Sequence, residues 1–382
     1  MNLRRAILLA GCIGVLLFVG QALAPVIEAT PPAPAIIQLT NDHANDVRPI
    51  WSPDNRMIAF QSNRVDPNVY HIYVMNADGS DQRALTQGST DDRHPFWMPD
   101  GKAILFDSSD GNQSEIWMVN VADGSRKQIT HIGGLANFPS VSPDGQHIAF
   151  YVYQNETLDL WTARLDGSGA TQLTHGLASA ANNQCTFACH QAAWSPDNRT
   201  IAYSAGELDT IWTIASDGSH RDKVISNGED NHFPWYMPDG RLGYITEHVN
   251  PVQSWTDAWI YDPKSGQSTL LQGHMSPQGP FDWNNNATQV LFHSPRSGNF
   301  EIYLVDLNAP GGVDALQGKS VPVQPSASAQ NSTGAAPLPS ANAPENNLTI
   351  LGIAAAFGAA VAASAFGLLI RRRIRNRGRT SS

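Results

Sequence analysis

Apolar and polar positions alternate in short blocks through most of the chain, and the blocks repeat. Short apolar runs end at turn-forming residues, as in "PIWSPDNRMIAF" (49–60) and "PFWMPDGKAILF" (95–106). Runs of this length between turn signals predict strands rather than helices. Related segments follow along the chain, so one corner residue recurs at intervals of 42 to 53 residues, as Trp51, Trp97, Val141, Trp194, Tyr236 and Trp283.

Each repeat has a similar second half, such as "HIYVMNADGSDQRALT" (71–86), in which Asp-Gly favours a tight hairpin. The Pro-Asp corner supplies another hairpin, and its aspartate is expected to bond local backbone amides. Four short antiparallel strands per repeat, repeated six times, predict an all-β, six-bladed β-propeller over residues 36–309. The corner tryptophans are expected to pack between neighbouring blades.

The last repeat lacks a fourth strand, and the missing strand stands at the other end of the domain. The segment "IIQLT" (36–40) matches the "RALT" strands and precedes the first corner. It is therefore expected to complete the sixth blade, so that an N-terminal strand closes the ring and leaves no free sheet edge.

The Trp-Ser-Pro-Asp corners, the Ile-Trp or Ile-Tyr strands and the Asp-Gly-Ser turns resemble the WD-like repeats of the TolB propeller family over residues 36–309. The resemblance implies a non-enzymatic, extracytoplasmic docking module whose channel mouth takes peptide segments of partner proteins. Similar repeats form the propeller of prolyl-oligopeptidase-like enzymes, but the G-x-S-x-G motif of their hydrolase domain is not found here.

Both ends of the chain predict membrane targeting. Residues 1–29 have two arginines before an apolar run, as in a secretory signal peptide, and "LAGC" leaves lipidation of Cys12 as an alternative. Residues 348–370 carry no charge and precede an arginine-rich segment, which predicts a C-terminal transmembrane helix with a basic cytoplasmic tail at 371–382. The propeller would then be extracytoplasmic on a single-pass protein of the cell membrane.

The segment between the propeller and this predicted helix has a different composition. Residues 310–347 are rich in Ser, Ala, Pro, Gln and Asn, so a disordered linker is expected there. Within it, "LPSAN" (338–342) is faintly similar to a sortase motif, which leaves a sorting tag as an alternative to an anchor.

The charge of the chain excludes one class of partner. The formal net charge of -10 becomes -18 when the eight arginines of the two terminal segments are left out. Phosphate-backbone binding needs clustered Lys and Arg, so nucleic acid is not an expected partner. The sequence also contains no phosphate-binding loop.

Two cysteines and a histidine lie together in "CTFACH" (185–190). The spacing between Cys185 and Cys189 is one residue longer than the usual haem-attachment motif. Because an exported domain lies in an oxidising compartment, a Cys185–Cys189 disulfide is the favoured interpretation. Free thiols and haem or metal binding are the alternatives.

The inner strands of a propeller converge on a channel, and the fourth position before each corner residue begins such a strand. The candidates for binding at the channel mouth lie at or near this position: Asp46, Asp92, His94, Asn137, His190 and His232. His94, His190 and His232 could hold Zn²⁺ or Mn²⁺, although His94 lies one residue out of register. No cofactor is expected.

The sequence thus favours a non-enzymatic scaffold that binds a protein or peptide partner at the channel mouth. A metal-dependent propeller enzyme of the lyase or lactonase type, using the channel histidines, is one alternative. A cell-wall or carbohydrate binding module is the other.

Overall fold

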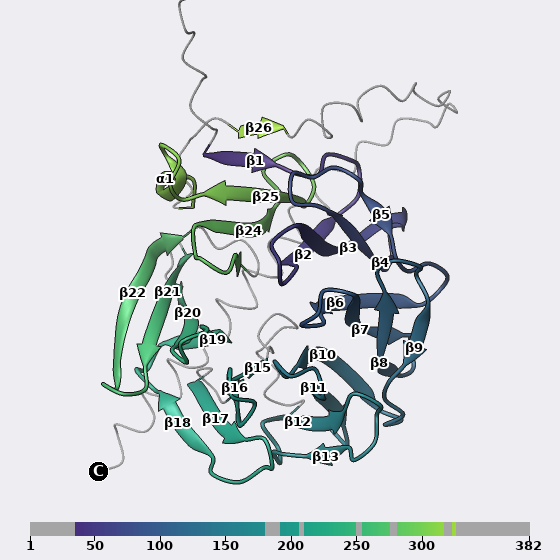
Figure 1. Cartoon of the computed structure of the whole chain (residues 1–382), viewed down its shortest axis with the longest axis vertical. Helices are drawn as coiled ribbons and strands as arrows, with labels where there is room; N and C mark the ends of the chain where they lie inside the picture. The colour runs from purple at the N-terminus through teal and green to yellow at the C-terminus, as the bar shows by residue number, and fades with distance from the viewer. Residues whose placement is uncertain are drawn as a thin grey trace, which may run out of the picture. The chain divides into compact units, whose positions relative to one another are not determined.

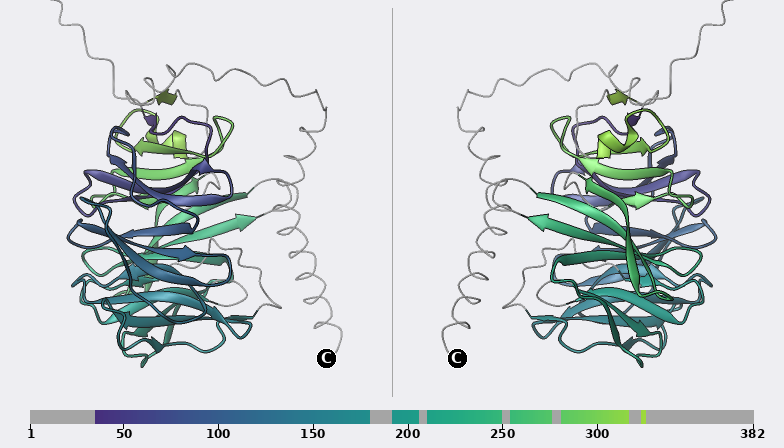
Figure 2. Two further views of the ribbon diagram at one scale, coloured as in Figure 1. Left: turned by 90° about the vertical axis from the view of Figure 1, so that its right-hand side faces the viewer. Right: turned by 90° about the vertical axis from the view of Figure 1, so that its left-hand side faces the viewer.

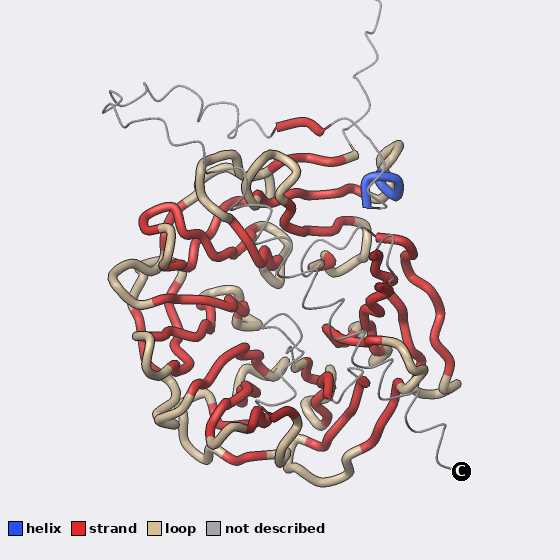
Figure 3. Tube along the Cα trace, turned by 180° about the vertical axis from the view of Figure 1, so that it is seen from behind, coloured by secondary structure: helices blue, strands red, loops and turns tan. Residues whose placement is uncertain are grey.

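A computed structural model describes residues 35–179, 192–205, 210–249, 254–275, 281–316 and 323–325. These residues belong to one compact unit that begins at Pro34. Strands dominate the described part of the chain (Figure 3), and α1 (Gly312–Leu316) is a single short helix beside them. The all-β propeller predicted from the repeats is confirmed.

The strands form antiparallel sheets of four, here called blades, which are arranged around a common centre with β2, β6, β10, β15 and β19 on the inner side (Figure 1). A single pairing between β8 and β10 joins two of the blades into one larger sheet, and β14 (Ala178–Ser179) also pairs with β12. The blade strands, in chain order, are β2 (Asp46–Trp51), β3 (Met57–Asp66), β4 (Val69–Asn76), β5 (Arg83–Ala84), β6 (Asp91–Trp97), β7 (Ala103–Ser109), β8 (Ser114–Asn120), β9 (Arg126–Gln128), β10 (Leu135–Val141), β11 (His147–Gln154), β12 (Thr157–Arg164), β13 (Thr171–Gln172), β15 (Ala193–Trp194), β16 (Thr200–Ala205), β17 (Thr210–Ala215), β18 (Asp222–Ile225), β19 (Asp230–Tyr236), β20 (Leu242–Val249), β21 (Ser254–Asp262), β22 (Gln267–Met275), β23 (Asp282–Trp283), β24 (Gln289–Ser294) and β25 (Glu301–Asp306).

The corner between the first two strands of each blade is held by its own side chains. In the first corner, Asp54 Oδ1 accepts hydrogen bonds from Ser52 Oγ at 2.7 Å and from the Arg56 amide at 3.1 Å. Asn55 follows with φ of 56°, a left-handed conformation that asparagine tolerates better than most residues. The predicted turn role of the corner aspartates is confirmed here, and it recurs at Asp100, Asp144, Asp197 and Asp239.

The core consists of apolar side chains between adjacent blades. Trp51 packs with Leu291 and Leu304 of the blade that closes the ring, and Trp97 and Trp194 pack in the same way against the blades before them. These three indoles are buried, as predicted, whereas that of the fourth corner tryptophan, Trp283, is half-buried against its cluster. The corner residue is therefore one of the large apolar contacts between each of these blades and its predecessor.

The first strand closes the ring as predicted. The strand β1 (Ile36–Gln38) pairs antiparallel with β25, with Ile36 opposite Val305, and the two lie side by side in the side views (Figure 2). A further strand, β26 (Val323–Pro325), pairs parallel with β1. The sequence had predicted a disordered linker over residues 310–347. The structure instead contains α1 and β26 within this segment.

Several predictions fall on residues that the structure does not describe. They concern the signal peptide with Cys12, the Cys185, Cys189 and His190 segment, and the membrane helix at 348–370. Among the described residues, no helix is long and apolar enough to cross a membrane.

Candidate functional site

Four inner strands contain an irregularity three residues before the corner residue. The pairing of β2 with β3 shifts register between Val47 and Ile50, and β6, β10 and β19 shift at the same place. At these bulges, bulky residues have a left-handed backbone, which costs about 1 to 3 kcal/mol each unless the surroundings enforce it. The residues are Arg48, His94, Phe138 and Phe233, with φ between 50° and 55°.

Side chains of the preceding blade hold three of these bulges in place. The His94 amide donates to Gln61 Oε1 at 3.0 Å, and the Phe138 amide donates to Asp107 Oδ1 at 3.0 Å. The Arg48 amide donates to His293 Nδ1 at 3.3 Å, across the closure of the ring. The three acceptors occupy the same position of the second strand in their blades, as Gln61, Asp107 and His293. The hydrogen bond that holds the bulge is therefore a feature of the repeat.

The bulge side chains from three blades meet one another. The Arg48 guanidinium lies 5.3 Å from the centroid of the Phe138 ring, and the His94 ring lies 3.9 Å from the same ring. His94 Nδ1 is 2.7 Å from Asp107 Oδ1. We call Arg48, His94, Asp107, Phe138 and His293 the axial cluster, because they come from four successive blades around the common centre.

The environment fixes the protonation of the cluster. Burial lowers the pKa of Arg48 to about 10, against the opposing effect of Asp107, so the guanidinium stays charged at neutral pH. Burial and the charge of Arg48 lower the pKa of His293 to about 3. His293 is therefore neutral, and since its Nδ1 accepts the Arg48 amide, its Nε2 carries the proton.

His94 is oriented by a carboxylate. Burial lowers its pKa, while Asp107 opposes this effect. With Nδ1 donating to Asp107, its Nε2 has a lone pair that can accept a proton or bind a metal. The axial cluster thus combines a fixed cation, an aromatic face, one hydrogen-bond donor and one basic nitrogen.

The predicted site residues are divided among different places. His94 belongs to the axial cluster. Asn137 precedes Phe138, and its side-chain Nδ2 donates to Leu135 O at 3.1 Å. His232 is 5% exposed and its ring lies 5.1 Å from that of Phe233. His190 lies outside the described residues, so the convergence of the three histidines stays a prediction.

The sequence had suggested that Asp46 and Asp92 are available for binding at the channel mouth. The structure places both elsewhere. Both are fully buried. Asp46 is 2.9 Å from Arg64, and Asp92 accepts Ser108 Oγ at 2.6 Å and lies 3.2 Å from Arg126. These arginines come from later strands of the same blade and cover the carboxylates, which corrects the prediction.

One group of acidic residues could hold a cation by its geometry. Within the described ranges, a group of at least three potential metal ligands occurs at Asp42, Asp46 and Glu301, and neither His94 nor His232 is in it. Arg64 lies 3.1 Å from Asp42 and 2.9 Å from Asp46, so a cation already stands among these carboxylates. Glu301 accepts Thr40 Oγ1 at 2.5 Å, which joins β25 to the segment after β1. We interpret the group as part of the ring closure.

Sequence reasoning missed most of the axial cluster. No sequence motif marks Arg48, Asp107, Phe138 or His293. The alternation of residues does not reveal a bulge, so the sequence pointed to the fourth position before each corner residue, whereas the bulge residues lie at the third. The signal that could have found them is the recurrence of large or polar residues three positions before the corner and ten positions after it.

Comparisons with known proteins agree with this fold. A family model described as the TolB beta propeller domain matches residues 66–235. The structure is similar to TolB from Acinetobacter baumannii, with 18% identity, a TM-score of 0.50 and coverage of 69% of this chain and 64% of that chain, so the match spans less than two thirds of that TolB. It is also similar to an oligogalacturonate lyase in complex with manganese, with 15% identity, a TM-score of 0.55 and coverage of 74% and 95%. No curated protein matches the sequence.

Proposed function

From the premise that this chain is a TolB-like β-propeller protein, we propose that it is a six-bladed scaffold that binds a peptide segment of a protein partner at the axial cluster. The observation that carries the proposal is the convergence of Arg48, His94 and Phe138 in strained conformations. Strain of this kind is maintained where a site must be preorganised.

The chemistry of the cluster suits an extended peptide. The Phe138 ring is 7% exposed and packs against Arg48 and His94, so it holds these two side chains in place. His293 Nε2 offers a donor for a peptide carbonyl. The Arg48 guanidinium can pair with a carboxylate of the bound segment, in a low-dielectric site that strengthens the interaction. Asn137 and His94 complete the contact surface on the neighbouring blades.

The proposal includes the location of the protein. We place the propeller outside the cytoplasm, with residues 1–29 as an export signal and residues 348–370 as a single-pass anchor in the cell membrane. The acidic balance of the sequence between these segments supports a partner other than nucleic acid.

The test is a pull-down with the full-length protein in its membrane. Arg48→Gln removes the positive charge of the cluster. Arg56→Gln is the matched control, because it removes the same charge from a side chain that is 85% exposed and lies at the edge of ion-pair distance, 3.9 Å, from Asp54. A polypeptide that co-purifies with the wild type and with Arg56→Gln but is lost with Arg48→Gln supports the scaffold. The same polypeptides with all three proteins would contradict it.

A metal-dependent enzyme of the lyase or lactonase type is the second candidate function. The orientation of His94 by Asp107 favours it, because a carboxylate that holds one imidazole nitrogen leaves the other ready to ligate a metal. The similarity to a manganese-containing oligogalacturonate lyase supports the same idea. About one equivalent of a transition metal in the wild type, lost in His94→Ala, would favour the enzyme over the scaffold.

A further inference from the structure

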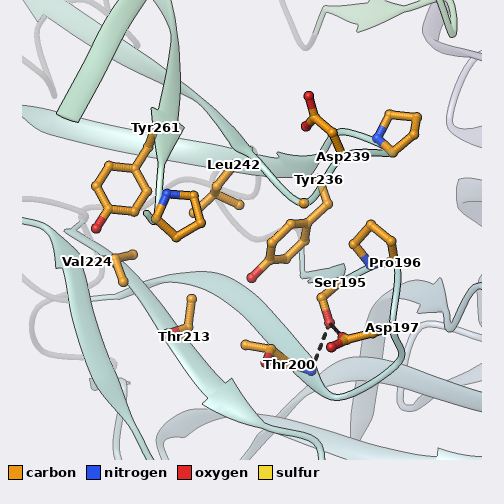
Figure 4. Close-up of a pocket in the computed structure, with 13 residues that line it drawn as sticks. Ser195, Pro196, Asp197, Thr200, Thr213, Val224, Tyr236, Asp239, Leu242 and Tyr261 are labelled. Atoms are coloured by element: carbon orange, nitrogen blue, oxygen red, sulfur yellow. Dashed lines mark hydrogen bonds between the residues drawn. The ribbon is translucent and has the colours of Figure 1, made fainter. Parts of the chain in front are cut away.

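A crevice of about 460 Å³ opens between the β15–β18 and β19–β22 blades, away from the axial cluster. Tyr236, Tyr261 and three prolines line it, and Thr200 and Thr213 line the side formed by β16 and β17 (Figure 4). Small-molecule sites have volumes of this order and combine apolar walls with a few polar groups. Nothing in the proposed peptide-binding function uses this crevice.

Comparison with another blade interface shows why the crevice is open. Between the β2–β5 and β6–β9 blades, Trp97 packs against Val74 and Met57 and is 4% exposed. At the corresponding positions of the crevice, Tyr236 replaces the tryptophan, and Thr213 and Thr200 replace Val74 and Met57. Three apolar groups are thus exchanged for hydroxyl-bearing groups that face one space, and Tyr236 is only half-buried.

The Ser195 hydroxyl of the crevice is bonded to Asp197, but four other hydroxyls that line it have no such partner among the described residues. Thr200 Oγ1, Thr213 Oγ1 and the hydroxyls of Tyr236 and Tyr261 make no hydrogen bond within the described part of the chain. Burial raises the pKa of Tyr236 to about 12, with a further contribution from Asp197, so this hydroxyl remains a donor at neutral pH. In Figure 4 it points into the crevice between its walls.

The charged groups at the rim are carboxylates. Asp197 accepts Ser195 Oγ at 2.6 Å, and Asp239 lies 2.8 Å from Arg241. No Lys, Arg or His is among the described residues that line the crevice. Hydroxyl groups of a ligand could donate to these carboxylate acceptors.

We propose that this crevice binds a neutral sugar ring. Tyrosine rings can cover the apolar face of such a ring, and its hydroxyls can both donate to Asp197 and exchange hydrogen bonds with the two threonines and Tyr236. A basic side chain would use the carboxylates and aromatic faces but would leave the threonine hydroxyls without a role. The exchange of Val and Met for Thr therefore favours the sugar.

The test uses the full-length protein in lipid nanodiscs, which avoids glycoside detergents. Saturation-transfer NMR and calorimetry measure binding of the methyl glycosides of glucose, galactose, mannose and N-acetylglucosamine. We expect at least one glycoside to bind with a Kd of roughly 1 to 10 mM. This weak affinity is expected because a single sugar ring makes few hydrogen bonds and a small apolar contact. Binding of a lysine hexapeptide to the crevice, with none of the glycosides bound, would overturn the proposal.

The variants locate the binding. The triple variant Thr200→Met, Thr213→Val and Tyr236→Trp gives the crevice the side chains of the filled interface, so glycoside binding should be lost. Tyr236→Phe, which keeps the packing, should weaken binding about threefold to tenfold, the effect of one hydrogen bond. Thr162→Val, at the β12 position equivalent to Thr213, should leave it unchanged. Unaltered binding by the triple variant or by Tyr236→Phe would refute the assignment.

Discussion

The closure of the ring should depend on pH through Glu301. Its carboxylate accepts Thr40 Oγ1 at 2.5 Å and the Asp42 amide at 3.1 Å, and it lies close to the Asp46 carboxyl. Burial raises the pKa of Glu301 from 4.5 to about 7, Asp46 adds to this effect, and the hydrogen bonds from Thr40 and Asn299 oppose it. The folded protein therefore holds a proton on Glu301 where the unfolded chain has released it.

The sign and size of the effect on the free energy of unfolding follow from the linkage between proton binding and folding. Between pH 4.5 and about 7 the folded state binds more protons than the unfolded state, so the contribution of Glu301 to stability falls as pH rises through this window. The full interval corresponds to about 3 kcal/mol. The Asp42 side chain beside it is 32% exposed, so solvent screening reduces our expectation to about 1 to 2 kcal/mol.

The assay is urea unfolding followed by tryptophan fluorescence from pH 5 to pH 8, for the wild type and Glu301→Gln. The amide keeps an acceptor for Thr40 but does not ionise, so the stability of the variant relative to the wild type should rise by about 1 to 2 kcal/mol over this range. This difference isolates Glu301 from groups such as His293, whose lowered pKa acts in the opposite direction.

A matched control is available in another blade. Glu115 accepts Thr130 Oγ1 at 2.5 Å and the Gly133 amide at 2.8 Å, as Glu301 does with its partners. It does not belong to the acidic group of Asp42, Asp46 and Glu301. Glu115→Gln therefore controls for the exchange of a carboxylate for an amide in the same hydrogen-bond arrangement. If the free energy of unfolding changed with pH in the same way for Glu301→Gln and the wild type, the reasoning would be refuted.

Three further predictions concern the core and the axial cluster. A Cβ on Gly243 would overlap the indole of Trp235, so calorimetry of Gly243→Ala should show a loss of about 1 to 3 kcal/mol, and an unchanged Tm would contradict the packing. Trp97→Ala should cost about 3 to 5 kcal/mol in urea unfolding, because the indole is 4% exposed between two blades. Since the pKa of His293 is lowered to about 3, its NMR signals should not titrate between pH 5 and pH 8, and a midpoint near its ordinary 6.5 would argue against the Arg48–His293 contact.

Much of the fold could be predicted because it is encoded locally. The corner aspartates and the left-handed asparagine or glycine beside them form turns from adjacent residues, and the recurrence of these turns sets the number of strands. The pairing of β1 with β25 could be predicted as well, because Ile36–Gln38 matches a strand that the last repeat lacks.

The site could not be predicted to the same extent, for two physical reasons. A bulge shifts every later side chain by one position, so Arg48, His94 and Phe138 converge instead of the residues before them. The burial of Asp46 and Asp92 depends on Arg64 and Arg126, which lie 18 and 34 residues further along the chain. No local pattern indicates that these pairs meet.

The most direct test of the scaffold is photo-crosslinking in the membrane of living cells. A benzoylphenylalanine replaces Asn137, beside the axial cluster, and in a separate protein it replaces Val65, which is 74% exposed on β3. We predict that position 137 crosslinks to one defined polypeptide that position 65 does not capture. The absence of a crosslinked polypeptide at position 137, or the same products from both positions, would contradict a peptide-binding role for the axial cluster.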